Sequence, residues 1–252
     1  IWEEERKIST LSALRTILAL IGHVLLGWSS SQSTDPSREF DALYAAIRDQ
    51  KIDRPSAVAR VRELLPRIRD DFYERGGVDT PAGRERFPVQ GYGAESIGGS
   101  NGSGYSAKGY DWFDGYKSAG HPGHDIFIHD RNQDALDDRT GQPVNILSIA
   151  SGIVVAYSSE WSADSNLRGG RYIYIYSPAH RGIFYYAHAR SVTVRPGDLV
   201  TAGQRIGTVG RSGRNASAAR SPTHLHVMFL SIDDGLPKPG DIYPMLKRLG
   251  RR

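Results

Sequence analysis

The 252-residue sequence contains no cysteine. This excludes a disulfide framework, a thiolate metal site and a cysteine nucleophile. A bound transition metal would therefore use histidine and carboxylate ligands, so the positions of the eight histidines matter most. The hydrophobic fraction is 39% and the mean hydropathy is −0.44, which is a globular composition and not that of a multi-span membrane protein.

Acidic residues are scarce in the last third of the chain. Residues 165–252 carry 14 basic and four acidic side chains, a net charge of +10, whereas residues 1–86 carry 14 of each. Such an arginine-rich segment predicts an anionic partner, such as nucleic acid, a lipid surface or an acidic cell-wall polymer. The sequence shows no zinc finger, RNP-like aromatic run or basic heptad segment, so only the charge favours nucleic acid.

Long hydrophobic runs are missing apart from one stretch near the N-terminus. Residues 17–28 are mostly apolar, follow the basic pair Arg6–Lys7 and precede a run of serines, the order found in secretory signals. Arg15 and His23 make this stretch a poor permanent membrane span. We therefore expect residues 1–33 to be an export signal or N-terminal anchor, with an amphipathic helix as the alternative.

Two helices are expected in residues 34–90. Asp35–Pro36 is a capping residue followed by proline at the first turn, and a single apolar stripe follows it, formed by Phe40, Leu43, Tyr44 and Ile47. Asp53 opens a second helix, which we expect to bend at Pro66. This region is predicted to be a helical hairpin that packs on the rest of the chain, and nothing in it indicates catalysis.

Residues 91–118 are rich in glycine and aromatic residues. Nine glycines lie between positions 91 and 120. Glycine at this density suits irregular backbone, while the aromatic residues indicate that the segment packs or binds a ligand. We expect a covering segment, or one wall of a substrate groove to which Tyr110 and Trp112 contribute.

From residue 143 onward the chain is rich in short strands. They contain many β-branched and aromatic residues, are separated by Gly/Pro/Ser turns, and are expected at 146–150, 152–156, 172–176, 182–186 and 224–230. No long helical pattern separates them. The sequence therefore predicts a mainly β protein with an antiparallel sheet.

Four histidines belong to three short motifs. His121 and Asp125 flank Pro122–Gly123, where a turn could bring the imidazole and the carboxylate together. His188 lies at the end of an aromatic strand. His224 and His226 are two residues apart, so on a strand both imidazoles face the same side. Two histidines and one aspartate suit Zn²⁺ and leave a fourth position for water, and two further histidines beside them could transfer protons.

These motifs, in this order, resemble those of the LytM/lysostaphin-type zinc metallopeptidases, which cleave peptide crosslinks of peptidoglycan. The family carries an HxGxD-type motif, then YxH, then HLH. This chain has them as His121–Asp125, Tyr186–His188 and His224–His226. The hairpin expected at 194–210 also resembles that of the family, and the likeness extends over about residues 119–245. One departure is the long segment 214–223, where the family has a glycine-rich turn.

The resemblance implies a role for each residue of the motifs. His121, Asp125 and His226 would hold one zinc ion, and His188 and His224 would be the catalytic pair that transfers protons. It also implies an antiparallel, barrel-sandwich-type peptidase domain at 119–246, followed by a basic tail at 247–252. Zinc would activate water for attack on the peptide bond.

The expected function is therefore hydrolysis of crosslinks or stem peptides of peptidoglycan. The substrate would lie in the bacterial cell envelope, so the protein would be periplasmic or secreted, and nucleic acid is not expected as a partner. The alternative is a non-catalytic relative that binds cell wall or activates an amidase. Such degenerate relatives lose zinc ligands, and this chain keeps all five key residues.

Local patterns in the sequence indicate roles for three further groups of residues. Tyr186, close to His188, is predicted to line the groove. Asp130, Asn132 and Asp134 resemble a Ca²⁺ loop, but the glycine and glutamate of an EF-hand are missing, and a solvated acidic loop is the alternative. Three more histidines are predicted to be bystanders that line the groove or face solvent: His124, His129 and His180.

Overall fold

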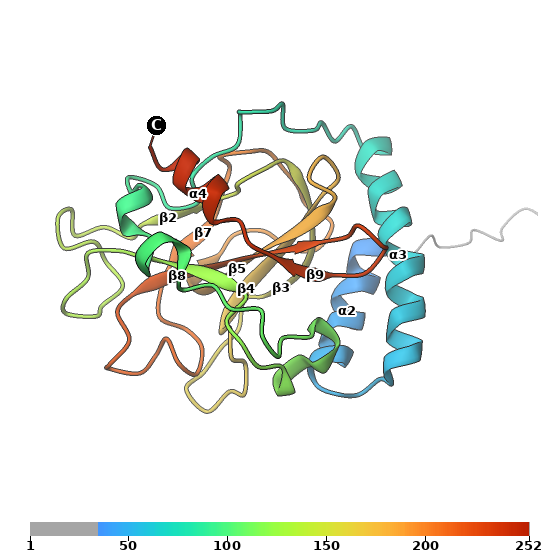
Figure 1. Ribbon diagram of the computed structural model, residues 1–252, viewed down its shortest axis with the longest axis horizontal. Helices are drawn as coiled ribbons and strands as arrows, with labels where there is room; N and C mark the ends of the chain where they lie inside the picture. Colours follow the sequence, from blue (N-terminus) through green and yellow to red (C-terminus); the bar gives the residue numbers. More distant parts are fainter. Residues whose placement is uncertain (1–34, 252) are drawn as a thin grey trace, which may run out of the picture. The chain divides into compact units, whose positions relative to one another are not determined.

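The computed structural model describes residues 35–251, and the predicted export signal or anchor at 1–33 lies outside them. Within the described part, two N-terminal helices lie beside a central sheet, as Figure 1 shows. In residues 35–251 no helix has the length and apolar character needed to cross a bilayer.

Both helices begin where the sequence predicts. Helix α2 spans Pro36–Arg48, and the carboxylate of Asp35 accepts a hydrogen bond from the Ser37 N–H at 2.9 Å. Helix α3 spans Arg54–Glu74, and Asp53 caps it in the same way through Ser56 at 3.0 Å. These bonds satisfy N–H groups that have no partner within a helix. Pro66 lies inside α3, which continues past it.

A nine-stranded antiparallel sheet forms the rest of the core, so the prediction of a mainly β, antiparallel fold is confirmed. The strands that form its main path lie in the order β1-β8-β5-β4-β3-β6. Strand β7 pairs with β5 and β2, and β9 pairs with β8. The strands are β1 (Gly123–Phe127), β2 (Asn145–Leu147), β3 (Gly152–Ser158), β4 (Arg171–Ser177), β5 (Gly182–Val192), β6 (Leu199–Val200), β7 (Arg205–Val209), β8 (His224–Ser231) and β9 (Lys238–Gly240).

Short helices occupy the segments around the sheet. The glycine-rich segment contains the 3-10 helices η1 (Ala94–Ser96), η2 (Ser100–Gly102) and η3 (Trp112–Lys117). Helix α4 (Tyr243–Leu249) follows β9 and buries Leu246 and Leu249. The domain boundary expected at residue 246 therefore falls inside a packed helix.

The two faces of the sheet pack against different partners. On β4, Ile173 and Ile175 face one hydrophobic cluster, which also receives α4, while the alternating tyrosines face the second cluster with α2 and α3. On β8, Met228 and Leu230 also belong to the second cluster. By the same alternation His224 and His226 lie on the face that bears the two helices.

Strand β5 contains a bulge at His188. Arg171 pairs with Ala189 and Ile173 pairs with Tyr186, so two residues of β5 oppose one residue of β4. The φ angle of His188 is +66°, in the left-handed region that non-glycine residues rarely adopt. The alternation of side chains along β5 is therefore interrupted at this residue, and His188 faces the same side as its neighbour Ala187.

Candidate functional site

The Asp125 carboxylate lies among three imidazoles. Its Oδ1 atom is 3.0 Å from Nδ1 of His226, 3.3 Å from Nε2 of His121 and 3.7 Å from Nε2 of His224. The pairing of β1 with β8 places Asp125 directly opposite His226. A Cβ atom on Gly123 would lie 2.7 Å from the His226 ring, so a glycine is needed at this point of the motif.

His121 is placed by the covering segment. Its backbone forms an isolated bridge with Ser106, and its Nδ1–H donates to the carbonyl oxygen of Gly104 at 2.7 Å. This bond directs Nε2 toward Asp125. We expected a turn at Pro122–Gly123 to join the two groups. Instead β1 already begins at Gly123, and the His121 side chain reaches the carboxylate from just before the strand.

His224 and His188 lie next to each other, with ring centres 4.9 Å apart. Nδ1–H of His224 donates to the carbonyl oxygen of Pro222 at 2.7 Å, and Nδ1–H of His188 donates to that of Ser212 at 2.8 Å. In a neutral imidazole the other nitrogen, Nε2, then carries the lone pair. Both residues line the same cavity, where Nε2 is the group able to accept a proton.

The electrostatics keep the Asp125 carboxylate charged and favour the neutral forms of His188 and His226. Burial raises the pKa of Asp125, but hydrogen bonds from His121 and His226 hold it well below its usual value. Burial lowers the pKa of His226, and burial together with neighbouring imidazoles lowers that of His188 to about 3. The bond to Asp125 raises the pKa of His121, which is the most exposed of the group.

One group of ligand atoms fits a metal ion. One atom each from His121, Asp125 and His226 lies within 4.8 Å of the others. Two imidazole nitrogens and a carboxylate oxygen are a donor set that Zn²⁺ accepts, and three ligands leave a position for water or substrate. The bond from His121 to Gly104 is the outer contact that commonly orients a metal-binding imidazole.

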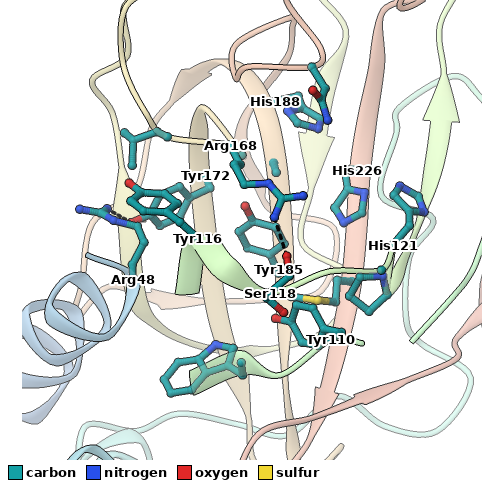
Figure 2. Close-up of a pocket in the computed structure, with 18 of the residues that line it drawn as sticks. Arg48, Tyr110, Tyr116, Ser118, His121, Arg168, Tyr172, Tyr185, His188 and His226 are labelled. Carbon is teal, nitrogen blue, oxygen red and sulfur yellow. Dashed lines mark hydrogen bonds between the residues drawn. The ribbon is translucent and has the colours of Figure 1, made fainter. Parts of the chain in front are cut away.

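These residues border a cavity of about 320 Å³ that extends from the histidines to α2 (Figure 2). Tyr110, Trp112 and Tyr116 come from the covering segment, and Tyr44 and Arg48 come from α2. Figure 2 shows His121, His188 and His226 on one side of the cavity and Arg48 on the other. The helical hairpin therefore contributes to the wall of the site.

Of the three residues predicted to line the groove, two lie at the cavity and one does not. Tyr110 and Trp112 line the cavity, and their contact with substrate stays a prediction. Tyr186 is fully buried in the cluster on the opposite face, where its hydroxyl accepts a hydrogen bond from the Ile149 N–H at 2.9 Å. The prediction that it lines the groove is wrong, because the bulge at His188 reverses the alternation. Tyr185 faces the cavity instead.

Sequence reasoning also missed several residues of the site. Gly104 and Ser212 supply the carbonyl groups that orient two imidazoles, and Arg168 and Tyr185 border the cavity. Of these four residues, only Tyr185 could have been found from the sequence, because side chains alternate along a strand and Tyr185 lies two residues before Ala187. The others come from loops, where the sequence has no periodicity to read.

The acidic loop at 130–134 forms hydrogen bonds within the protein. Asp130 is buried and accepts from the N–H groups of Asp134 and Ala135 and from the hydroxyl of Thr223. Asn132 donates to Asp134 at 3.0 Å. The oxygens proposed for Ca²⁺ are thus engaged in fixing the loop, and calcium binding stays a prediction.

The three predicted bystander histidines differ in exposure. His129 is exposed, as expected. His124 is completely buried, with Nε2 2.9 Å from Oδ1 of Asp241, so it neither lines the groove nor faces solvent. The His180 side chain is 15% exposed and bonds to Ser177, which also contradicts the expected exposure.

Residues 131–235 match the model of peptidase family M23. This segment contains His188, His224 and His226, while His121 and Asp125 precede it. A search of curated proteins gave no match.

Solved structures similar to this chain include peptidases of three bacteria. Lysostaphin from Staphylococcus simulans is 26% identical (52% of this chain, 45% of that one, TM-score 0.36). A zinc-containing peptidase from Vibrio cholerae is 22% identical (61% and 38%, TM-score 0.37). A candidate glycyl-glycine endopeptidase LytM from Ruminococcus gnavus is 23% identical (87% and 84%, TM-score 0.45). The chain thus spans less than half the length of the first two.

Proposed function

Since residues 131–235 match the model of peptidase family M23, we propose that the protein is a zinc-dependent endopeptidase that hydrolyses peptide bonds of bacterial peptidoglycan. The observation that carries this proposal is the arrangement around Asp125. A carboxylate oxygen and two imidazole nitrogens converge at one side of a cavity, and two more imidazoles border the same cavity.

His121, Asp125 and His226 would hold the metal. A zinc ion there supplies polarisation of the scissile carbonyl and acidification of water. The ionised Asp125 carboxylate would also offset the positive charge of the ion. The hydrogen bond from His121 to Gly104 and the pairing of β1 with β8 fix the orientations of the ligand side chains.

His188 and His224 would move the proton. Because the carbonyl groups of Ser212 and Pro222 hold their Nδ1–H groups, each ring offers Nε2 to the cavity. One Nε2 can take the proton of the attacking water, and the protonated ring can then donate it to the leaving amine nitrogen. While protonated, the ring also donates a hydrogen bond to the negative charge that develops on the carbonyl oxygen.

Charge supports an anionic polymer as substrate. The net charge of +10 over residues 165–252 lies largely within the peptidase segment and would attract the acidic cell wall. The proposed location is accordingly the bacterial cell envelope. A non-catalytic cell-wall module is the competing function, and the presence of all five site residues favours the enzyme.

Two measurements test the proposal. Purified protein should contain one zinc ion at neutral pH, and zinc-loaded protein should release soluble muropeptides from peptidoglycan. His188→Ala and His224→Ala should each retain zinc and lose activity by about 10²–10⁴-fold. His129→Ala, at an exposed histidine outside the cluster, is the matched control and should change neither quantity. Absence of zinc, or full activity in both variants, refutes the proposal.

A further inference from the structure

Arg168 carries an uncompensated positive charge at the cavity. Its guanidinium donates to the carbonyl oxygen of Ser118 at 2.7 Å, and within residues 35–251 no carboxylate lies in ion-pair range of it. Arg48, the other arginine of the cavity wall, is already paired with Asp49 at 2.8 Å and donates to the Tyr172 hydroxyl at 2.9 Å. Arg168 is therefore available to a ligand in a way that Arg48 is not.

The backbone next to Arg168 is hydrogen-bonded to the backbone of His188. The carbonyl oxygen of Gly169 accepts a hydrogen bond from the His188 N–H at 2.8 Å. A Cβ atom on Gly169 would lie 1.9 Å from the Tyr185 hydroxyl, so the chain passes directly beside the hydroxyl end of that side chain. Figure 2 shows the Arg168 side chain extending from this point into the cavity. Its position is thus fixed relative to the proposed catalytic residues.

The cavity beside Arg168 suits a substantial side chain. Seven tyrosine and tryptophan side chains contribute to its wall, and its volume of about 320 Å³ is within the range of small-ligand sites. A hydrocarbon chain lying against these rings would bury apolar surface. A glycine bridge offers neither a side chain for this space nor a carboxylate for the guanidinium. The aromatic wall consists of Tyr44, Tyr110, Trp112, Tyr116, Tyr172, Tyr174 and Tyr185.

We propose that Arg168 binds a substrate carboxylate and so determines specificity. The preferred crosslink would carry, next to the scissile bond, a diamino-dicarboxylic acid residue such as diaminopimelate with its carboxylate free. This inference rests on the proposed peptidoglycan substrate. A guanidinium and a carboxylate form charge-assisted hydrogen bonds, which are stronger than neutral ones, and Arg168 keeps nitrogen donors beyond the one bonded to Ser118.

The test compares two crosslinked peptides that differ only in whether the diaminopimelate carboxylate is free or amidated. Dissociation constants are measured calorimetrically with metal-free protein. The wild-type protein should bind the free carboxylate about tenfold more tightly. Arg168→Gln should remove this preference, and Arg168→Lys should keep part of it. Arg171→Gln is the matched control, because Arg171 donates to the Ser159 carbonyl and lies outside the cavity wall.

Two results would overturn the inference. The first is equal binding of both peptides by the wild-type protein. The second is equal weakening of both peptides by Arg168→Gln, which would mean that Arg168 only holds its loop to Ser118. Since the binding measurement needs no metal and no hydrolysis, it is independent of the proposed activity. Preference for the carboxylate without release of muropeptides refutes the enzyme alone. Release of muropeptides without the preference refutes the specificity alone.

Discussion

The hydroxyl of Thr223 donates a hydrogen bond to Oδ2 of Asp130 at 2.5 Å, across 93 positions of sequence. Both residues are buried, and Arg211 donates to the same hydroxyl oxygen at 3.1 Å. Thr223 immediately precedes His224, so this contact holds the start of β8 against the acidic loop. The acidic loop thus positions a residue of the proposed catalytic pair.

Replacement of Asp130 by alanine should therefore destabilise the protein and displace His224. The change leaves the Thr223 hydroxyl and two backbone N–H groups without their acceptor, and we expect a loss of about 2–3 kcal/mol in the free energy of unfolding. Urea denaturation measures it. Asp233→Ala, at an exposed site, should stay within about 0.5 kcal/mol of wild type. Equal stability of the two variants would contradict this role of Asp130.

Zinc should stabilise the folded protein through Asp125. At a free zinc concentration of 100 times Kd, a ligand that binds only the folded state adds about 2.7 kcal/mol, which calorimetry detects as a higher Tm. Asp125→Ala removes the central ligand and should abolish both the shift and the bound zinc. Asp134→Asn, an exposed carboxylate of the acidic loop, should leave them unchanged. A zinc-dependent shift that survives in Asp125→Ala would place the metal elsewhere.

Gly169 and Tyr185 should be energetically coupled. A methyl group on Gly169 would collide with the Tyr185 hydroxyl and displace the carbonyl that holds the His188 N–H. We expect Gly169→Ala to lower kcat/KM on the order of 10²-fold. Tyr185→Phe removes the colliding oxygen, so the double variant should recover much of the loss. If the effects of the two changes simply add, the steric explanation fails.

Stability should fall in acid partly because of Asp137. A hydrogen bond from Arg139, helped by one from Tyr92, holds the pKa of this almost fully buried carboxylate below its usual value of 3.8. A pKa that is lower in the folded state stabilises the protein above the unfolded value, and this contribution disappears as pH falls below about 4 through the folded value. Urea unfolding from pH 7 to pH 2 follows the loss.

Asp137→Asn should be less stable at neutral pH and should show a flatter pH dependence. Asp138→Asn, at the exposed neighbouring aspartate, should keep the wild-type profile. If the Asp137→Asn curve ran parallel to the wild-type curve below pH 4, the carboxylate would not be the source of the acid sensitivity.

Local patterns in the sequence were sufficient for the two N-terminal helices and for several strands, and the order of three short motifs, through its family resemblance, indicated the candidate ligands. The Asp–Pro helix start at Asp35 and the same-face pair His224 and His226 depend on contacts or geometry within a few residues, which the sequence contains. The absence of cysteine restricted the metal donors to nitrogen and oxygen before any fold was known.

Tertiary structure decided which other residues meet at the site. The bulge at His188 places its side chain on the same side as Tyr185 and opposite to Tyr186, which a pattern of strict alternation could not reveal. The placement of Arg168 at the cavity depends on a backbone hydrogen bond from His188 to Gly169, and that of Asp130 against Thr223 on a hydrogen bond between their side chains. Such contacts form only when the sheet is assembled, because no local rule links residues so far apart in sequence.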